Sequence, residues 1–176
     1  YDDKALAEEG VGNLIEVTLP IIGNYELMLA GIEHPLNKTE FYDFNDKYLS
    51  GKKGESADNA YSKIPADIDE QLSAHVENLG KKTYHVLGCS GIARVDFLID
   101  NATKRVYVNE VNTLPGSLSH HNWRKMGVSG VELVTKLITL AQDRFQKQGK
   151  LIRTFKSDIL HFDFKARGLA PAMEVE

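Results

Sequence analysis

Four polar residues in the second half of the chain, Arg94, Asp96, Glu110 and Asn112, have the side chains of a metal and phosphate site. Asp, Glu and Asn all supply oxygen, which a hard ion such as Mg²⁺ prefers, and Mg²⁺ usually leaves positions for water or substrate phosphate. Arg94 adds a permanent positive charge with a planar set of donors. Such a set would hold two phosphate groups through the metal and neutralise charge as a phosphoryl group moves.

The spacing of these residues predicts that they share one face of a hairpin. Residues 92–99 and 105–111 are β-rich runs, and the turn-forming residues 100–104 between them have the length of a hairpin loop. Side chains alternate along a strand, so the four polar residues should lie on one face together with Val108. The opposite face is expected to pack on helices and carries Val95, Phe97, Ile99, Tyr107 and Val111.

A second interpretation of the same residues needs no ligand. Arg94 could form a surface ion pair with the two acids, while Asn112 caps the following turn. The apolar opposite face favours the metal interpretation, because the polar residues are then part of a buried sheet rather than the solvent side of a weak one.

The remaining elements predicted around the hairpin include strands and two long helices. Residues 14–29 suggest one or two strands, with Pro20 breaking the ladder and Gly23-Asn24 forming a turn. Asp67 and Glu70 resemble a capping pair for a helix that ends at Gly88. Its expected apolar face is Leu72, Val76, Leu79, Thr83 and Val86.

Ser129 and Glu132 form a capping box that predicts a second long helix. Its expected buried face is Leu133, Val134, Leu137, Ile138, Ala141 and Phe145. Residues 48–65 read as a surface loop, and the tail from Lys150 as an irregular or edge segment.

Composition indicates an ordinary globular protein and argues against several classes. The chain has 176 residues, 42% of them hydrophobic, and a formal net charge of −4, which does not suit a general electrostatic grip on nucleic acid. No apolar run is long enough for a membrane span, and the start has no signal pattern. The single cysteine, Cys89, is expected to be a small buried hydrophobe. We therefore expect a cytoplasmic protein with no nucleic-acid or membrane partner.

Two segments around the hairpin strands closely resemble the signature of D-alanine–D-alanine ligases, which are ATP-grasp enzymes. These segments are residues 88–100, from Gly88 to Asp100, and residues 108–116, from Val108 to Gly116. Residues 41–48 look like the ω-loop of this family, and the spacing of Glu9 and Glu16 looks like its adenosine-binding hinge. The resemblance spans most of residues 8–145.

The resemblance implies an α+β fold, the ATP-grasp carboxy-terminal domain, with a mostly antiparallel sheet and flanking helices. Residues 1–176 would form this single domain, and residues 1–30 would complete the adenine hinge. The family's amino-terminal substrate domain and glycine-rich loop are not in this sequence. We therefore expect a fragment, truncated or cleaved, that does not turn over alone; a homodimer is one expected state of the full-length protein.

The resemblance also implies roles for single residues. Asp96, Glu110 and Asn112 would bind two Mg²⁺ ions, for which Mn²⁺ could substitute, and Glu110 would bridge them. Arg94 would stabilise the tetrahedral and phosphorylated intermediates, and Gly116 would offer a backbone N–H near the reacting carboxylate.

Three further residues are implied contacts of ATP. Glu9 would face the adenine edge, Glu16 the ribose hydroxyls, and Lys47 the terminal phosphate. Without the resemblance, Glu16 is an outward-facing strand residue and Lys47 a solvated loop lysine.

One stretch departs from the family pattern. Where the family presents a serine and then a leucine at the acceptor carboxylate, this chain has His121 and Asn122, preceded by His120. The histidines could be a carboxylate clamp or a polar loop, and a zinc site is disfavoured because only Cys89 offers a thiol. Trp123 is expected to be a packing anchor.

The implied activity is an ATP- and Mg²⁺-dependent carboxylate–amine ligase that works through an acyl phosphate on amino-acid substrates. D-alanine–D-alanine ligation for peptidoglycan precursors is the first expectation. A related ligase with a different acceptor amino acid is the close alternative. A non-catalytic Mg-ATP-binding module is the alternative of another class.

Overall fold

The computed structural model describes residues 4–36 and 62–151 of the chain. The predicted ω-loop with Lys47, most of the predicted loop 48–65, and the tail after residue 151 lie outside these ranges. The chain divides into two compact units, Tyr1–Arg144 and Phe145–Glu176, and the fold below is that of the first. Within the described ranges there is no helix long and apolar enough to cross a membrane.

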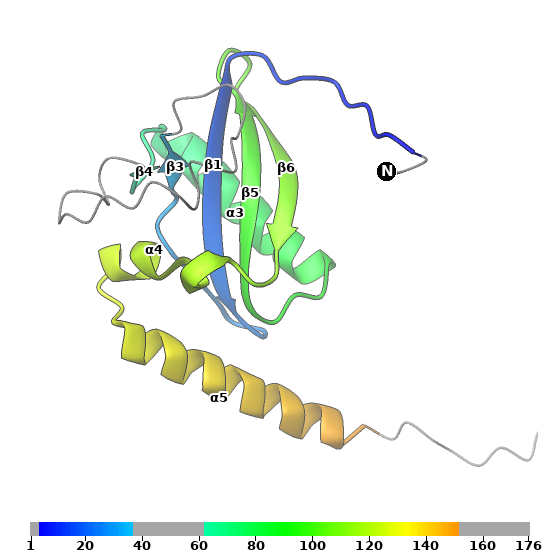
Figure 1. The fold of residues 1–176 in the computed structure, drawn as a ribbon, viewed down its shortest axis with the longest axis vertical. Helices are drawn as coiled ribbons and strands as arrows, with labels where there is room; N and C mark the ends of the chain where they lie inside the picture. Colours follow the sequence, from blue (N-terminus) through cyan, green and yellow to red (C-terminus); the bar gives the residue numbers. More distant parts are fainter. Residues whose placement is uncertain (1–3, 37–61, 152–176) are drawn as a thin grey trace, which may run out of the picture. The chain divides into compact units, whose positions relative to one another are not determined.

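The first unit is built on a four-stranded antiparallel sheet (Figure 1). Its strands are β1 (Leu14–Gly23), β2 (Leu27–Leu29), β5 (Gly91–Asp100) and β6 (Arg105–Asn112), in the order β2-β1-β5-β6. A separate pair joins β3 (His34–Pro35) to β4 (Ser62–Lys63). The predicted α+β class, with a mostly antiparallel sheet and flanking helices, is confirmed.

Pro20 does not break the first strand, contrary to the prediction. It lies inside β1, where it pairs with Arg94 of β5, and its carbonyl accepts a hydrogen bond from Ala30 N at 2.9 Å. The backbone of Pro20 therefore points away from β5, so the missing N–H costs nothing in that ladder. On the other side the pairing register shifts by one residue between Ala30 and Glu33, and an irregular ladder tolerates the absent donor.

The predicted hairpin of β5 and β6 is confirmed, but it contains a β-bulge. Asp96 pairs with Glu110 while Phe97 pairs with Val108, which leaves Asn109 as an extra residue in β6. Opposed residues share a face, so Val108 shares the face of Phe97, and Tyr107 shares the face of Leu98. The predicted faces of Val108 and Tyr107 were therefore wrong. The bulge is what turns Glu110 and Asn112 to the side of Asp96.

Helix α3 (Glu70–Val86) covers one face of the sheet, as Figure 1 shows behind the strands. Its N-cap is Asp69, whose carboxylate accepts from Leu72 N at 2.8 Å, so the predicted role of Asp67 was wrong. Asp67 instead pairs with Lys63 at 2.7 Å. The helix ends before Gly88, as predicted, where a φ of +64° suits glycine.

The buried stripe of α3 repeats every four residues: Leu72, Val76, Gly80 and Tyr84. The predicted stripe included Val86, which is 84% exposed. Gly80 allows close approach, since a Cβ there would lie 2.8 Å from Leu19 Cδ2. The Tyr84 hydroxyl donates to Gly23 O at 2.8 Å, and burial raises the pKa of Tyr84 to about 12. The core under this helix includes Val17, Leu19, Ile21, Ala93, Val95, Phe97 and Ile99.

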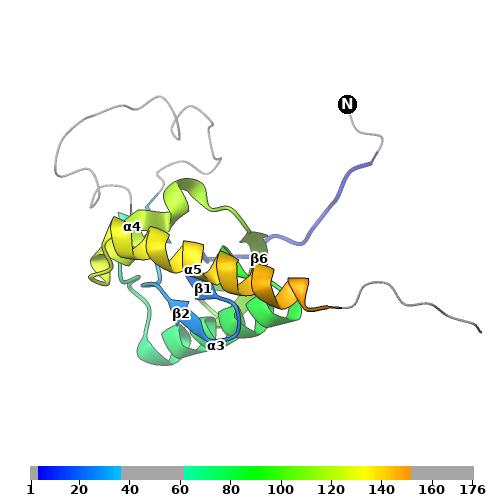
Figure 2. The same cartoon turned by 90° about the horizontal axis from the view of Figure 1, so that it is seen from below.

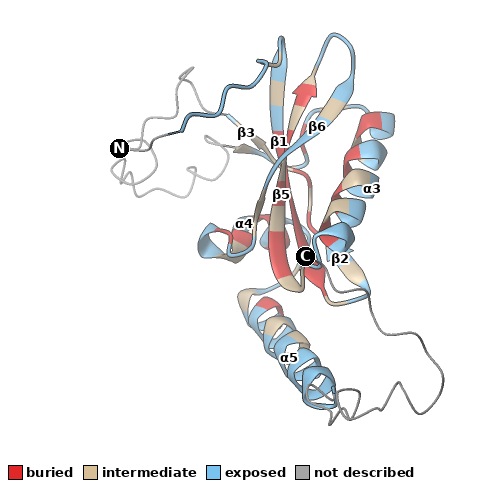
Figure 3. Cartoon of the chain, turned by 90° about the vertical axis from the view of Figure 1, so that its right-hand side faces the viewer, coloured by how far each residue is buried: buried red, intermediate tan, exposed pale blue. Residues whose placement is uncertain are grey.

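The segment Gly116–Lys125, after β6, lies on the other side of the sheet from α3 (Figures 2 and 3). It forms the 3₁₀ turn η1 (Gly116–Ser119) and the short helix α4 (His120–Lys125). Trp123 of α4 is fully buried, which confirms it as a packing anchor. It packs in a second core cluster with Ile22, Ala30, Ile92 and Leu133.

Helix α5 (Gly130–Gly149) begins with the predicted capping box. Ser129 N donates to the Glu132 carboxylate at 2.8 Å, and Glu132 N donates to Ser129 Oγ at 3.2 Å. Only Leu133 of this helix is buried, with Leu137 and Leu140 packed beside it. The predicted face was wrong for Val134, Ile138 and Phe145, which are 47%, 54% and 78% exposed.

Candidate active site

A row of polar residues crosses the sheet face opposite α3. Strand pairing sets Glu33 beside Thr18, Thr18 beside Asp96, and Asp96 beside Glu110. Directly opposed residues share a face, so these four side chains form one line over four neighbouring backbone segments. The next row contains Arg94 and Asn112. The predicted convergence of polar groups on one face is therefore present, and it extends further than expected.

Arg94 and Asp96 form a two-point ion pair within this site. Arg94 Nε donates to Asp96 Oδ1 and Arg94 Nη2 to Asp96 Oδ2, both at 2.7 Å. Asn112 joins the two acids, because its Nδ2 donates to Asp96 Oδ2 at 3.0 Å and to Glu110 Oε1 at 2.9 Å. The ion pair of the ligand-free interpretation is thus formed, but it includes Asn112 as a bridge between carboxylates rather than as a turn cap.

The electrostatics of the cluster favour a cation. Burial raises the pKa of Asp96, the hydrogen bonds and charge of Arg94 oppose this, and the nearby Glu110 raises it further. The hydrogen bond to Asp96 raises the pKa of Arg94. Two carboxylates therefore share one partly buried place with a single guanidinium. A divalent ion would relieve their mutual repulsion.

The donors available are two carboxylates and one amide. The described residues contain no group of three or more His, Cys, Asp or Glu side chains that could hold a metal. Asp96 and Glu110 with the Asn112 amide oxygen nevertheless fit Mg²⁺, which binds one or two carboxylates and keeps water or phosphate on its other positions. The amide would present its oxygen by turning over, since its nitrogen faces both carboxylates here.

The other predicted site residues are placed less tightly. Glu16 lies in β1 and pairs with Leu98, two residues from Asp96, so it shares the polar face. Glu9 is exposed in the segment before β1, which has no secondary structure. Gly116 opens η1 a short way after the site strand, which ends at Asn112, and a Cβ at Gly116 would meet nothing within 4 Å. Lys47 lies outside the described residues.

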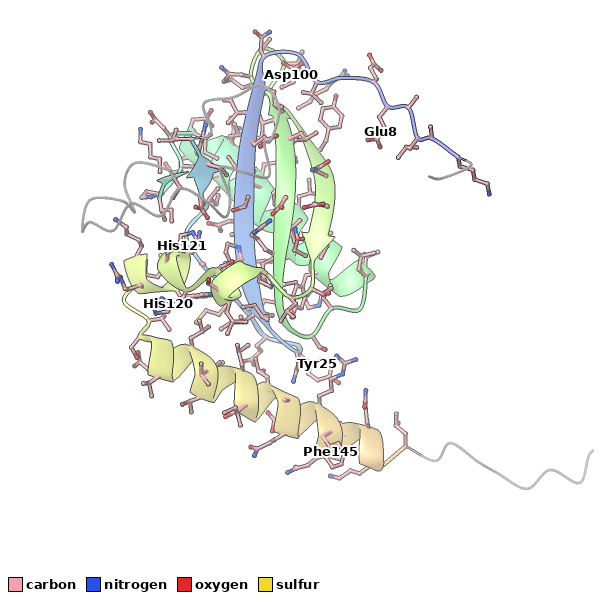
Figure 4. The ribbon with its side chains drawn as sticks, viewed as in Figure 1. Glu8, Tyr25, Asp100, His120, His121 and Phe145 are labelled. Carbon is pink, nitrogen blue, oxygen red and sulfur yellow. The ribbon has the colours of Figure 1, made fainter. Side chains whose placement is uncertain are left out.

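The two histidines of α4 do not act as a pair (Figure 4). His121 faces Glu33, the residue before β3, and its Nε2 lies 3.0 Å from each oxygen of that carboxylate. His120 faces the start of α5, where its Nε2 would lie 3.2 Å from a Cβ on Gly130. The two side chains thus face different neighbours, and of the two histidines only His121 joins the polar row.

Asn122, which is predicted to contact substrate, has a packing role in this structure. Its side chain is fully buried and donates from Nδ2 to Gly31 O at 3.2 Å. It also lowers the pKa of the nearby Glu33 carboxylate. A helix turns successive residues about 100° apart, so the side chains of His121 and Asn122 in α4 point in different directions.

Glu33 is a member of the site that the sequence did not indicate. It falls in the short stretch Ile32–Pro35, which is too short for alternation to reveal a face. Its carboxylate becomes part of the site only because the register shift after Ala30 sets it opposite Thr18. No local pattern could have shown this.

Comparison with known proteins agrees with this geometry. The family described as the D-ala D-ala ligase C-terminus matches residues 1–139. The chain belongs to this family. The match includes β5, β6 and the turn after them, so it covers every described residue of the polar face.

Curated relatives of the chain are named D-alanine–D-alanine ligases, in agreement with the family description. A D-alanine–D-alanine ligase of Thermosipho melanesiensis is 35% identical over 146 residues, which is 83% of this chain and 38% of that protein. One from Acetivibrio thermocellus is 38% identical over 149 residues, covering 82% of this chain and 38% of the relative. The chain therefore spans about two fifths of the length of these relatives.

Solved structures of ligases share the fold. The VanG D-Ala:D-Ser ligase from Enterococcus faecalis matches with a TM-score of 0.55 and 31% identity, over 72% of this chain and 36% of that one. The D-alanine–D-alanine ligase from Coxiella burnetii matches with a TM-score of 0.59 and 24% identity, over 79% of this chain and 34% of that one. The second likeness supports the fold alone.

Proposed function

We propose that this chain supplies the metal and phosphate half of an ATP-dependent carboxylate–amine ligase, with D-alanine–D-alanine ligation as the first candidate reaction. The observation that carries the proposal is the Arg94, Asp96, Glu110 and Asn112 cluster, joined by hydrogen bonds of 2.7–3.0 Å. Family membership and the names of the curated relatives support the same reaction.

Asp96, Glu110 and Asn112 are the proposed holders of two Mg²⁺ ions. Bound there, the ions would supply positive charge to the phosphate oxygens of ATP. Arg94 lies beside the two acids and carries a permanent charge, so it is suited to a phosphoryl group in transfer. Two hydrogen bonds to Asp96 fix the planar guanidinium group of Arg94, and this sets the direction of its remaining N–H donors.

The other half of the reaction is an attack by an amine on the acyl phosphate. Gly116 follows the metal strand closely, and its N–H is the proposed donor to the reacting carboxyl oxygen. Glu16 on the same face is proposed for the ribose hydroxyls. Glu9 for adenine and Lys47 for the terminal phosphate remain proposals carried by the family resemblance.

The identity of the acceptor amino acid is the part of the reaction that the proposal has to specify further. His121 is the proposed contact of the acceptor carboxylate, because it is 44% exposed and projects from α4 beside the polar row. VanG joins D-Ala to D-Ser, so acceptors differ among proteins with this fold. D-serine is therefore the second acceptor to test.

The test is ADP release by the full-length protein in which this chain occurs. The assay contains Mg-ATP and D-alanine, D-serine or a panel of other amino acids. We expect turnover with D-alanine and its loss in Glu110→Gln. Glu77→Gln is the matched control, since Glu77 is exposed on α3 across the sheet.

Each outcome separates the candidates. Turnover only with another acceptor keeps the chemistry and changes the substrate. ATP binding that depends on Mg²⁺, without release of ADP for any amino acid, would favour the non-catalytic module.

A further inference from the structure

The carboxylate of Glu33 is enclosed by donors at the end of the polar row. Its side chain is 12% exposed, and His121 Nε2 lies 3.0 Å from both of its oxygens. The Thr18 hydroxyl donates to Oε2 at 3.5 Å, and the nearby side chains of Ser62 and Asn122 also lower the pKa of Glu33. These residues belong to β1, β4 and α4, so the surroundings of Glu33 come from three elements.

The enclosed carboxylate is ionised. Burial alone would raise the pKa of Glu33, but the hydrogen bond and charge of His121 and the hydrogen bonds of Ser62 and Asn122 lower it. An ionised carboxylate accepts hydrogen bonds and cannot donate. The Nε2 of His121 must therefore carry the proton that lies between the two side chains.

This contact fixes the imidazole ring of an exposed residue. The His121 side chain is 44% exposed, and a free surface side chain of that kind would sample several rotamers. A hydrogen bond from Nε2 to both carboxylate oxygens selects one ring orientation and one protonated nitrogen. The remaining edge of the ring is then presented in a constant direction.

Glu33 also acts on Arg94. Its charge raises the pKa of Arg94, so the two groups interact across the site. Glu33 thus interacts both with the cation proposed for the phosphate and with the histidine proposed for the acceptor.

We propose that Glu33 is a positioning residue of the acceptor site, which holds the His121 imidazole in the orientation that receives the acceptor amino acid. The inference rests on the proposed ligase function and deepens it. Glu33 itself need not touch the substrate, since the carboxylate is already surrounded by protein donors. Its effect is transmitted through His121.

A purely structural role for Glu33 makes different predictions. Glu33 also hydrogen-bonds Thr18 through backbone and side chain, so it tethers β3 to β1. If tethering were its only function, a Glu33 variant would lower the stability of the fold. It would then impair the use of both substrates, ATP and the acceptor, to a similar extent. A positioning role instead raises KM for the acceptor and leaves KM for ATP unchanged.

The experiment compares Glu33→Ala, Glu33→Gln, His121→Ala and the Glu33→Ala/His121→Ala double variant in the full-length protein. We expect Glu33→Ala to raise acceptor KM roughly tenfold to hundredfold, the range for losing a hydrogen bond to a charged group. Glu33→Gln keeps the size and one acceptor oxygen, so it should preserve the fold and give a smaller rise. The double variant should match His121→Ala, because the effect of Glu33 passes through that ring.

A spectroscopic measurement on the 176-residue chain needs no turnover. Imidazole ¹⁵N spectra should show His121 protonated at Nε2 in the wild type and a changed pattern in Glu33→Gln. Glu77→Gln on the far side of the sheet should leave the spectrum unchanged.

The outcomes are distinguishable. No turnover of the wild type with any amino acid overturns the proposed function and the positioning role with it. Turnover with unchanged acceptor KM in both Glu33 variants, additive effects in the double variant, or a His121 spectrum that ignores Glu33→Gln overturns the positioning role alone.

Discussion

The two faces of the central sheet are built from the same strands and do opposite things. Under α3, the side chains are apolar and almost fully buried: Val17, Leu19, Ile21, Val95 and Phe97. On the other face, Glu33, Thr18, Asp96 and Glu110 form a polar row in which carboxylates crowd together. Burial of apolar surface stabilises the fold, whereas unrelieved like charges oppose it. One face therefore provides the rigidity on which the other arranges its chemistry.

The largest expected effect is a difference in stability between variants of two adjacent β5 residues that lie on opposite faces of the sheet. Phe97 is 1% exposed under α3, and Leu98 lies on the polar face. Phe97→Ala should lower the free energy of unfolding of the chain by about 3–5 kcal/mol, because it leaves a cavity. Leu98→Ala should cost less than about 1 kcal/mol. Urea unfolding of both variants measures the difference, and equal costs would refute the division into faces.

The second effect concerns the charges on the polar face. Mg²⁺ should stabilise the chain by about 1.4 kcal/mol at ten times its dissociation constant, because it binds the folded state only. Glu110→Gln should lose this stabilisation. In Mg²⁺-free buffer the same variant should be as stable as wild type or slightly more so, since a like charge beside Asp96 is removed. Thermal unfolding with and without Mg²⁺ tests both points, and a Mg²⁺ response that survives in the variant would place the metal elsewhere.

A smaller effect is expected from the Tyr84 hydroxyl, a polar group within the apolar core under α3. Tyr84→Phe removes the hydroxyl that donates to Gly23 O at 2.8 Å and leaves that carbonyl without this donor. The expected loss is about 1 kcal/mol in the free energy of unfolding. The urea midpoint should fall with an unchanged slope. A midpoint equal to that of the wild type would mean that water replaces the hydroxyl.

The smallest effect is a pH dependence on the polar face. The folded-state pKa of Glu33 is lowered from its ordinary value of 4.5, so ionised Glu33 stabilises the fold above that value. The contribution is lost as pH falls from about 5 through the lowered pKa. Glu33→Gln has no such group, and its stability should fall less over this range. Urea unfolding at several pH values below 6 measures it, with Glu77→Gln as a control that should follow the wild type.

The sequence predicted those features that depend on local pattern. Alternation along β5 and β6 revealed the hairpin and brought Arg94, Asp96, Glu110 and Asn112 together. The reciprocal bonds of Ser129 and Glu132 confirm a capping box that needs only four residues to be recognised. Such signals are complete within a short stretch of chain.

Features that depend on distant packing could not be predicted in this way. The exposed Val134 and Ile138 of α5 are as apolar as its buried Leu133, and only contact with Trp123 and its neighbours decides which side is covered. Glu33 entered the site through a register shift between Ala30 and its pairing with Thr18. Neither the buried side of α5 nor the pairing of Glu33 can be inferred from the residues next to them in the sequence.

The β-bulge at Asn109 determines where β6 can change in length without moving its side chains to the other face. Asn109 is unpaired, and the residues after it are displaced by one position relative to those before it. Deleting Asn109 would join Val108 to Glu110 in a regular ladder and leave both side chains on the faces that they now occupy. A residue deleted or inserted between Glu110 and Asn112 has no bulge to absorb it, so it would exchange the faces of the residues beyond it. The strand should therefore tolerate a change of length at Asn109 that it would not tolerate two residues later.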